Sequence, residues 1–353
     1  MIILIERKLV ENTVRSFHER YQLPGISMCF TDSTGEDYPM AAGVRHIASD
    51  VKLDPYDHLR VGSITKIFIS TLILKMKDEG IVSLEQTVDS ILPGILKDGT
   101  HITVRHLLQH RSGLKDYIWM DVAGTNCIQH AVSSLHDEFP PQSLIRLASS
   151  HVLQFESGTE FNYSNTGYIL LGMIAEKLTG ESIEKLLDKW IIQPLQLERT
   201  YFPSTNDLRK PFGAGYSKAT PDLTDLSDEI SEITHLNVSI VWAAGALISN
   251  PIDIQTFMKS LFNGHLLSKK SLTEMMCFFE ADDPKQSYGL GLHQYTFDDG
   301  RQAIGHQGGI HGYESVTLYY PDCEMSLTVI VNQMPVGVVA IANQLFRKIT
   351  KGI

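Results

Sequence analysis

The sequence predicts an α+β protein in which both ends of the chain combine helices with strands and the middle is mostly helical. Near the start, apolar residues at helical spacing over 8–20 precede two strand-like runs, Ile26 to Thr31 and Tyr38 to Val44. From about residue 81 the pattern changes to helices joined by polar loops. Strand-like runs return over 288–295, 302–305, 314–320 and 326–332, and a helical pattern over 338–349 closes the chain.

Composition and charge exclude several classes of protein. The 353 residues are 43% hydrophobic and 20% charged, which is typical of a soluble globular enzyme and leaves room for two domains. The formal net charge of -11 argues against nucleic acid or an anionic membrane surface as a partner. No run approaches the ~18 continuous apolar residues of a membrane span. Residues 1–8 have the wrong order for a signal peptide, so we expect a cytoplasmic protein, or a periplasmic or secreted one if a leader was removed.

One stretch carries the first candidate for catalysis. The run from Ile67 to Met76 is apolar on nearly all faces and is followed by Gly80, which predicts a buried helix that begins near Ser63. Residues three apart share a helix face, so the side chains of Ser63 and Lys66 can meet. A serine hydroxyl becomes a good nucleophile when a base takes its proton, and a lysine can be that base when burial lowers its pKa. Because Ser-x-x-Lys is common by chance, the buried helix that follows it is what favours the catalytic interpretation.

A second stretch, Tyr163-Ser164-Asn165, lies on a turn-rich loop just before a predicted helix that stops at Thr179-Gly180. The Tyr163 phenol could pass a proton between a lysine, a nucleophile and a leaving group. The Asn165 carboxamide could orient a substrate carbonyl or amide. Turn residues that cap a helix are the structural alternative for these three positions.

Glycines and histidines mark two further places. The segment 305–313 is rich in glycine beside a predicted strand, which is typical of a backbone that approaches a ligand closely.

His106 and His110 are four residues apart, the spacing of metal ligands, but no acidic residue accompanies them in the helix. We therefore expect both to be surface or core histidines and predict no metal site.

Three stretches in this order, Ser63-Ile64-Thr65-Lys66, Tyr163-Ser164-Asn165 and His306-Gln307-Gly308, resemble the three motifs of the serine β-lactamase and penicillin-binding-protein superfamily. The tyrosine in the second motif points to the class C branch, which includes DD-carboxypeptidases, D-aminopeptidases and β-lactamase-like esterases. The resemblance covers most of residues 10–335. It implies an antiparallel sheet flanked by the N- and C-terminal helices, formed by a discontinuous α/β domain of residues 1–80 and 285–353. A mostly helical domain of residues 81–284 would be inserted, with the active site at the seam.

The resemblance also implies a role for each motif residue. Ser63 would be acylated by the substrate carbonyl, while Lys66 and Tyr163 share the proton transfers. Asn165 would hold the amide or ester side group of the substrate. The backbone N–H groups of Ser63 and Gly309 would bind the oxyanion. No metal or organic cofactor is required, and the partner would be a small-molecule or peptide substrate.

The third motif departs from the β-lactamase pattern. Class C β-lactamases carry a lysine where this chain has His306, whose reference pKa of ~6.5 gives a full positive charge only in mild acid. Gln307, next to Gly308 in the same substrate-binding motif, replaces a threonine whose hydroxyl could bind the same substrate carboxylate. A DD-peptidase, a D-amino-acid amidase or a small-acyl esterase is therefore preferred. A penicillin-binding or sensor-type protein with little turnover, and a weak class C-like β-lactamase, stay open as alternatives, as do the stereochemical preference and the oligomeric state.

Overall fold

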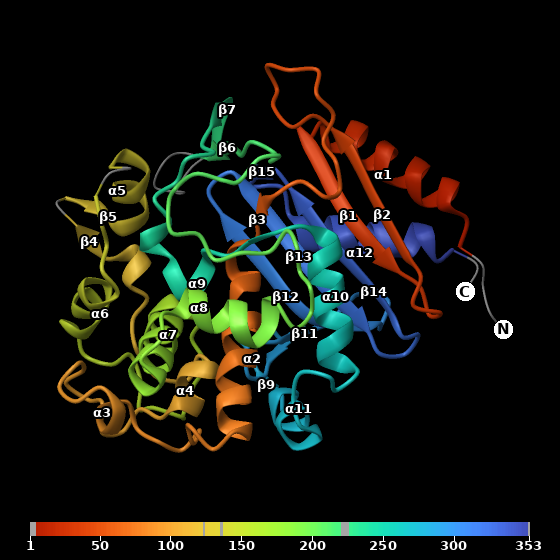
Figure 1. The fold of residues 1–353 in the computed structure, drawn as a ribbon. Coiled ribbons are helices and arrows are strands. Elements are labelled where there is room, and N and C mark those ends of the chain that lie inside the picture. Colours follow the sequence, from red (N-terminus) through yellow and green to blue (C-terminus); the bar gives the residue numbers. More distant parts are fainter. Residues whose placement is uncertain (1–4, 123, 135–136, 220–225, 352–353) are drawn as a thin grey trace.

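A single large antiparallel sheet forms the framework of the protein. The computed structural model describes residues 5–122, 124–134, 137–219 and 226–351 (Figure 1). Eight strands follow one another across the sheet in the order β2-β1-β14-β13-β12-β11-β10-β9, which confirms the predicted α+β class. Their bounds are β1 (Gly25–Thr31), β2 (Asp37–Gly43), β9 (Phe279–Glu280), β10 (Gln286–Tyr288), β11 (His293–Thr296), β12 (Gln302–Ile310), β13 (Tyr313–Tyr320) and β14 (Met325–Val331).

The two ends of the chain meet within this sheet. β1 pairs with β14, with Ile26 opposite Val331, so strands from near the two ends of the chain are neighbours. Alternate residues of both strands form a core with the terminal helices α1 (Arg7–Tyr21) and α12 (Val338–Ile349). Helix α10 (Pro251–Phe262) covers the opposite face and packs on β1 and β14 (Figure 1). The predicted arrangement of sheet and terminal helices is therefore confirmed.

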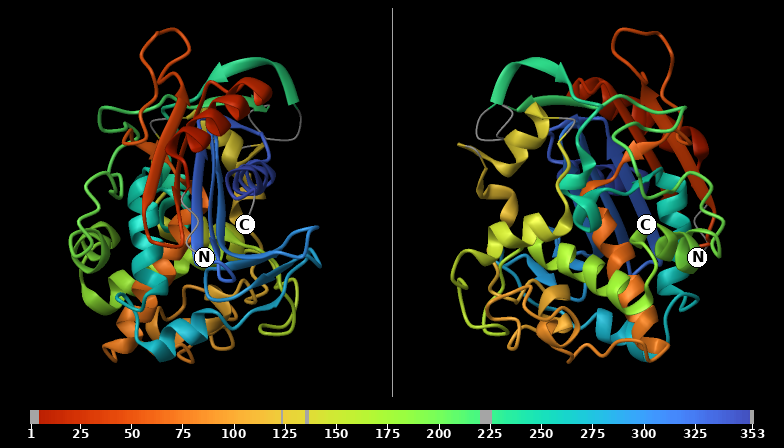
Figure 2. Two further views of the ribbon diagram at one scale, coloured as in Figure 1. Left: turned by 90° about the vertical axis from the view of Figure 1, so that its right-hand side faces the viewer. Right: turned by 60° about the vertical axis from the view of Figure 1, so that its left-hand side comes forward.

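The middle of the chain is mostly helical, and short strands support it. Figure 2 shows these helices gathered beside the sheet, on the side away from α1 and α12. The helices are α3 (Val88–Ile91), α4 (Val104–Leu108), α5 (Cys127–Ser133), α6 (Pro141–Ser149), α7 (Asn165–Thr179), α8 (Ile183–Leu187), α9 (Trp242–Gly245) and α11 (Lys269–Met275), with a π-helical turn at Asp188–Ile192 and 3₁₀ turns at Tyr117–Trp119 and Val238–Ile240. Small sheets pair β3 (Leu59–Arg60) with β8 (Ile248–Ser249), β4 (Asp121–Val122) with β5 (Thr125–Asn126), and β6 (Tyr216–Ala219) with β7 (Leu226–Glu232) and β15 (Gln333–Met334).

Helix α2 (Thr65–Asp78) runs through the centre of the molecule and follows a 3₁₀ turn, η1 (Gly62–Ile64), that carries Ser63. Its residues from Thr65 to Leu74 are all buried, because α7 and α9 pack on it and η1 contacts β12. A helix that is apolar all round is stable only in such surroundings. The predicted buried helix is therefore confirmed, and Ser63 lies one turn before it.

The structure differs from the predicted elements in two places. The sequence predicts one strand over 288–295, but β10 ends at Tyr288 and β11 begins at His293, with a turn closed by the Gly289 N–H donating to Leu292 O at 2.8 Å. The sequence also predicts an irregular segment over 204–235, whereas β6 and β7 lie within it. β7 is polar and has no apolar alternation, so its pairing with β6, rather than its own pattern, makes it a strand.

Among the described residues, no helix is long and apolar enough to cross a membrane. The division into a discontinuous domain of residues 1–80 and 285–353 and a helical domain of residues 81–284 remains a prediction.

Candidate active site

Two glycines allow the third motif to lie directly against Ser63. Gly62 has φ +52, and a Cβ there would come within 2.8 Å of the Gly309 backbone. A Cβ on Gly308 would lie 2.1 Å from the carbonyl oxygen of Val61 and 3.0 Å from the Ser63 nitrogen. Any larger residue at either position would push β12 away from η1. The glycines therefore place the Gly309 backbone beside the serine.

Lys66 is oriented as a base toward Ser63. Its Nζ lies 3.0 Å from Ser63 Oγ, 2.7 Å from Asn165 Oδ1 and 2.8 Å from the carbonyl oxygen of Ala244. The amide and carbonyl oxygens can only accept hydrogen bonds, so in the neutral amine they take both N–H groups. The remaining lone pair of the amine then points at the Ser63 hydroxyl.

Burial brings the pKa of Lys66 close to neutrality, so that its neutral form is available as a base. Lys66 is fully buried, and burial lowers the pKa of its ammonium to about 7, while the nearby Asp116 carboxylate acts in the opposite direction. Asp116 reaches the lysine through Asn165, whose Nδ2 donates to Asp116 Oδ2 at 2.8 Å. Burial also raises the pKa of the Asp116 carboxyl. Asn165 is thus held at both ends of its amide, by Lys66 and by Asp116.

Tyr163 lies on the other side of the serine. Its phenol is hydrogen-bonded to Ser63, and its ring centroid lies 4.9 Å from Lys66 Nζ. Burial raises the pKa of Tyr163 well above its usual value, and the hydrogen bond with Ser63 opposes this shift. The phenol therefore stays protonated at neutral pH and can donate its proton.

His306 occupies the place of the cation in the third motif, and it is neutral. The ring is 1% exposed, and burial, His293 and Lys66 together hold its pKa well below the usual range. Its Nε2 lies 3.1 Å from Tyr288 Oη, and its Nδ1 is hydrogen-bonded to the carbonyl oxygen of Gln307. The expectation of a full charge in mild acid is therefore wrong, because it used the reference pKa of an exposed histidine.

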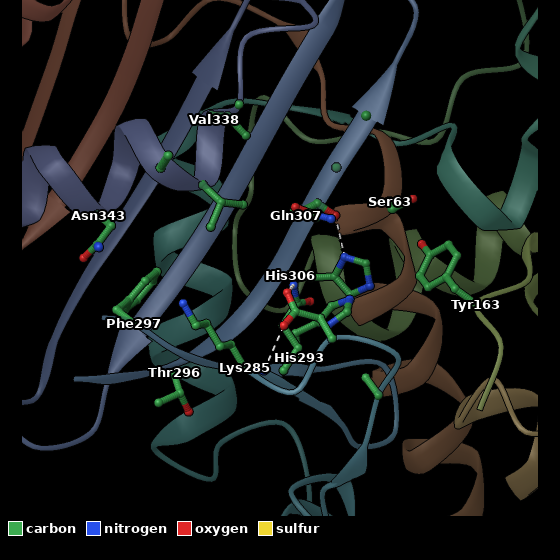
Figure 3. A pocket seen from close by; sticks show the side chains of 18 of the residues that line it. Ser63, Tyr163, Lys285, His293, Thr296, Phe297, His306, Gln307, Val338 and Asn343 are labelled. Carbon is green, nitrogen blue, oxygen red and sulfur yellow. Dashed lines mark hydrogen bonds between the residues drawn. The ribbon is translucent and has the colours of Figure 1, made fainter. Parts of the chain in front are cut away.

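A cavity of about 850 Å³ opens at this cluster (Figure 3). It is lined by six of the predicted site residues: Ser63, Tyr163, His306, Gln307, Gly308 and Gly309. Lys285 is the single lysine or arginine among the described residues of its wall, and it is paired with Asp298 at 2.5 Å. Carboxylates of Asp282 and Asp283 also line the wall. The one lysine of the described wall is thus engaged by a carboxylate in an exposed ion pair.

The structure therefore brings together all eight predicted site residues, since Lys66 contacts both Asn165 and Ser63, and Ser63 lines the cavity. His106 and His110 take no part in a metal site: His106 caps α4 at Thr103, and no cluster of potential ligands occurs among the described residues. Sequence reasoning missed Asp116, Tyr288 and His293. Asp116 lies two residues after the stretch 102–114, which resembles the family. Nothing in the sequence links Asp116, Tyr288 or His293 to Ser63.

Comparisons with known proteins agree with this geometry. The family model for beta-lactamases matches residues 10–349. A D-stereospecific amidohydrolase from a Streptomyces species is 31% identical, with a TM-score of 0.85 over 99% of both chains. D-amino acid amidase from Ochrobactrum anthropi has the same fold, with 24% identity, a TM-score of 0.85 and 98% of both chains covered. Penicillin-binding protein 4* of Bacillus subtilis is 25% identical over 341 residues, which cover 93% of this chain and 72% of that protein. The chain is a member of the beta-lactamase family, in its class C-like branch.

Proposed function

We propose that the protein is a serine amidase or peptidase that forms an acyl-enzyme through Ser63 and prefers substrates with an uncharged leaving group. The burial of His306, with its Nε2 hydrogen-bonded to Tyr288 and its pKa held well below the usual range, is the observation that carries this proposal. A substrate ending in a carboxylate needs a cation, and the single lysine of the described cavity wall is already paired. An amide or ester needs no such partner.

Each step of the reaction has a group in position. Neutral Lys66 takes the proton of Ser63 Oγ as the oxygen attacks the substrate carbonyl. The backbone N–H groups of Ser63 and Gly309 bind the oxygen that gains negative charge. Tyr163 gives its proton to the departing nitrogen or oxygen and recovers one from Lys66. Water then attacks the ester on Ser63, and the same groups act in reverse order to release the acid.

Amides of D-amino acids are the substrate class that fits best. Such amides carry an ammonium group and no carboxylate, which suits a cavity wall with the carboxylates of Asp282 and Asp283. The similarity to a D-stereospecific amidohydrolase at 31% identity supports the same choice.

Paired substrates test the proposal. We expect kcat/KM for D-alanyl-D-alanine amide to exceed that for the free acid by at least tenfold, and nitrocefin to be a poor substrate, because His306 offers no charge to their carboxylates and Lys285 is paired with Asp298. A fluorescent phosphonate should label the wild type and leave Ser63→Ala unlabelled. Equal or faster cleavage of the free acid would contradict the leaving-group preference. A single burst from p-nitrophenyl acetate without further turnover would indicate a sensor instead.

A further inference from the structure

A chain of hydrogen bonds leads from the end of α4 to the third-motif histidine. His110 Nε2 lies 3.1 Å from Tyr288 Oη, and Tyr288 Oη lies 3.1 Å from His306 Nε2. All three side chains are at most 2% exposed. The reaction steps above use neither His110 nor Tyr288. Burying a polar ring costs folding free energy unless its polar atoms are hydrogen-bonded, and in this chain of three rings they are.

Two backbone groups fix the direction of every hydrogen bond in this chain. The Ser164 N–H can only donate and lies 3.1 Å from His110 Nδ1, so the hydrogen of the neutral His110 ring is on Nε2. His110 therefore donates to Tyr288 Oη, whose own hydrogen could go to Tyr168 or to His306. At the other end, the Gln307 carbonyl can only accept, so it takes the Nδ1–H of His306, and the lone pair on Nε2 then accepts the Tyr288 hydroxyl.

From this geometry we infer that His110 and Tyr288 are positioning residues that, with the Gln307 carbonyl, hold His306 as the neutral Nδ1–H tautomer and so exclude substrates whose leaving group carries a carboxylate. Adding a proton to His306 Nε2 would require the Tyr288 hydroxyl to give up its present hydrogen bond and turn to another acceptor. The consequence for substrates rests on the proposed function, but the tautomer of His306 does not depend on it.

The other groups around His306 act in the same direction. The rings of Tyr163 and His293 lie 6.2 and 4.8 Å from the His306 ring, and Lys66 is the nearby cation. Burial lowers the pKa of His293 to about 3, so it is neutral as well. Among the described groups that shift the pKa of His306, none is a carboxylate that could stabilise an imidazolium.

Nitrogen-15 NMR of the histidine rings tests the inference on the whole protein, because the chemical shifts distinguish the two tautomers and the imidazolium. His306→Gln assigns the His306 signals by their loss. We expect wild-type His306 to be the Nδ1–H tautomer and not to titrate between pH 5 and 8. In Tyr288→Phe the ring remains but the hydroxyl that donates to His306 Nε2 is lost, so this nitrogen is open to a proton and His306 should begin to titrate between pH 5 and 8. The ratio of kcat/KM for amide over free acid should then fall about tenfold.

Tyr320→Phe is the matched control, since it removes a buried hydroxyl without a hydrogen-bond partner from the same sheet. It should leave the His306 signals unchanged. If Tyr288→Phe does not fold, His110→Gln is informative, because its amide N–H replaces the Nε2–H donor and should preserve the His306 tautomer. An Nε2–H tautomer in the wild type, or a His306 ring that still does not titrate in Tyr288→Phe, would overturn the inference. If the wild type has the expected His306 tautomer but cleaves the amide and the free acid with equal kcat/KM, the proposed function alone is contradicted.

Discussion

The carboxylate of Asp116 should set the pH at which Lys66 becomes a base. The Lys66 Nζ to Asn165 Oδ1 distance is 2.7 Å and the Asn165 Nδ2 to Asp116 Oδ2 distance is 2.8 Å. Across the amide the two charges are therefore about 7 Å apart, which gives roughly 2.4 kcal/mol at an effective dielectric constant of ~20. Burial of its carboxyl raises the pKa of Asp116, but the residue as a whole is only half-buried, so solvent screening reduces this energy and we expect an effect of about one pH unit.

Asp116→Asn isolates this charge, since an asparagine can still accept the hydrogen bond from Asn165. Removing the carboxylate lowers the pKa of Lys66 further below about 7, so its neutral form is available at lower pH. The acid limb of the pH profile of kcat/KM should move down by about one unit, measured between pH 4 and 9 with p-nitrophenyl acetate.

Asp121→Asn provides the control, because it removes the same charge from an exposed position five residues further along the chain. Its acid limb should coincide with that of the wild type. An acid limb that stays in place or moves upward in Asp116→Asn would refute the assignment of Lys66 as the titrating base. The rate of phosphonate labelling against pH gives an independent measure of the same limb.

Three further predictions concern the residues around Ser63. Lys66→Ala and Tyr163→Phe should each lower kcat by roughly 10²-fold or more, which is the scale of general acid–base catalysis. If either variant keeps wild-type turnover in steady-state assays, the role assigned to that residue is wrong. His306→Lys should lower KM for D-alanyl-D-alanine free acid by roughly tenfold, as a charge-assisted hydrogen bond would, and no gain with this substrate or with penicillins would contradict the carboxylate argument. Gly308→Ala should lower the free energy of unfolding in urea by about 1–3 kcal/mol, because its Cβ would meet Val61 O at 2.1 Å. Gly309→Ala, where a Cβ meets nothing within 4 Å, should unfold like the wild type.

Local spacing along the chain determined the parts of the site that sequence could predict. Ser63 and Lys66 meet because a helical turn brings residues three apart together wherever the helix lies. The glycines around His306 predicted a close backbone approach, and the resemblance of three motifs placed Tyr163 and Gly309 beside Ser63. The terminal helices and the central strands were readable from their apolar periodicity for the same local reason.

Only the tertiary structure decided the charges in the site. The neutrality of His306 depends on burial and on Tyr288 and His110, which come from separate parts of the chain and carry no sequence signal that connects them. The same holds for Asp116, which acts on Lys66 through a third residue. A pKa depends on solvent access and on every nearby dipole, and these are properties of the folded arrangement rather than of any one segment. The sequence alone therefore determined which groups could react, while folding determined which of them carry charge.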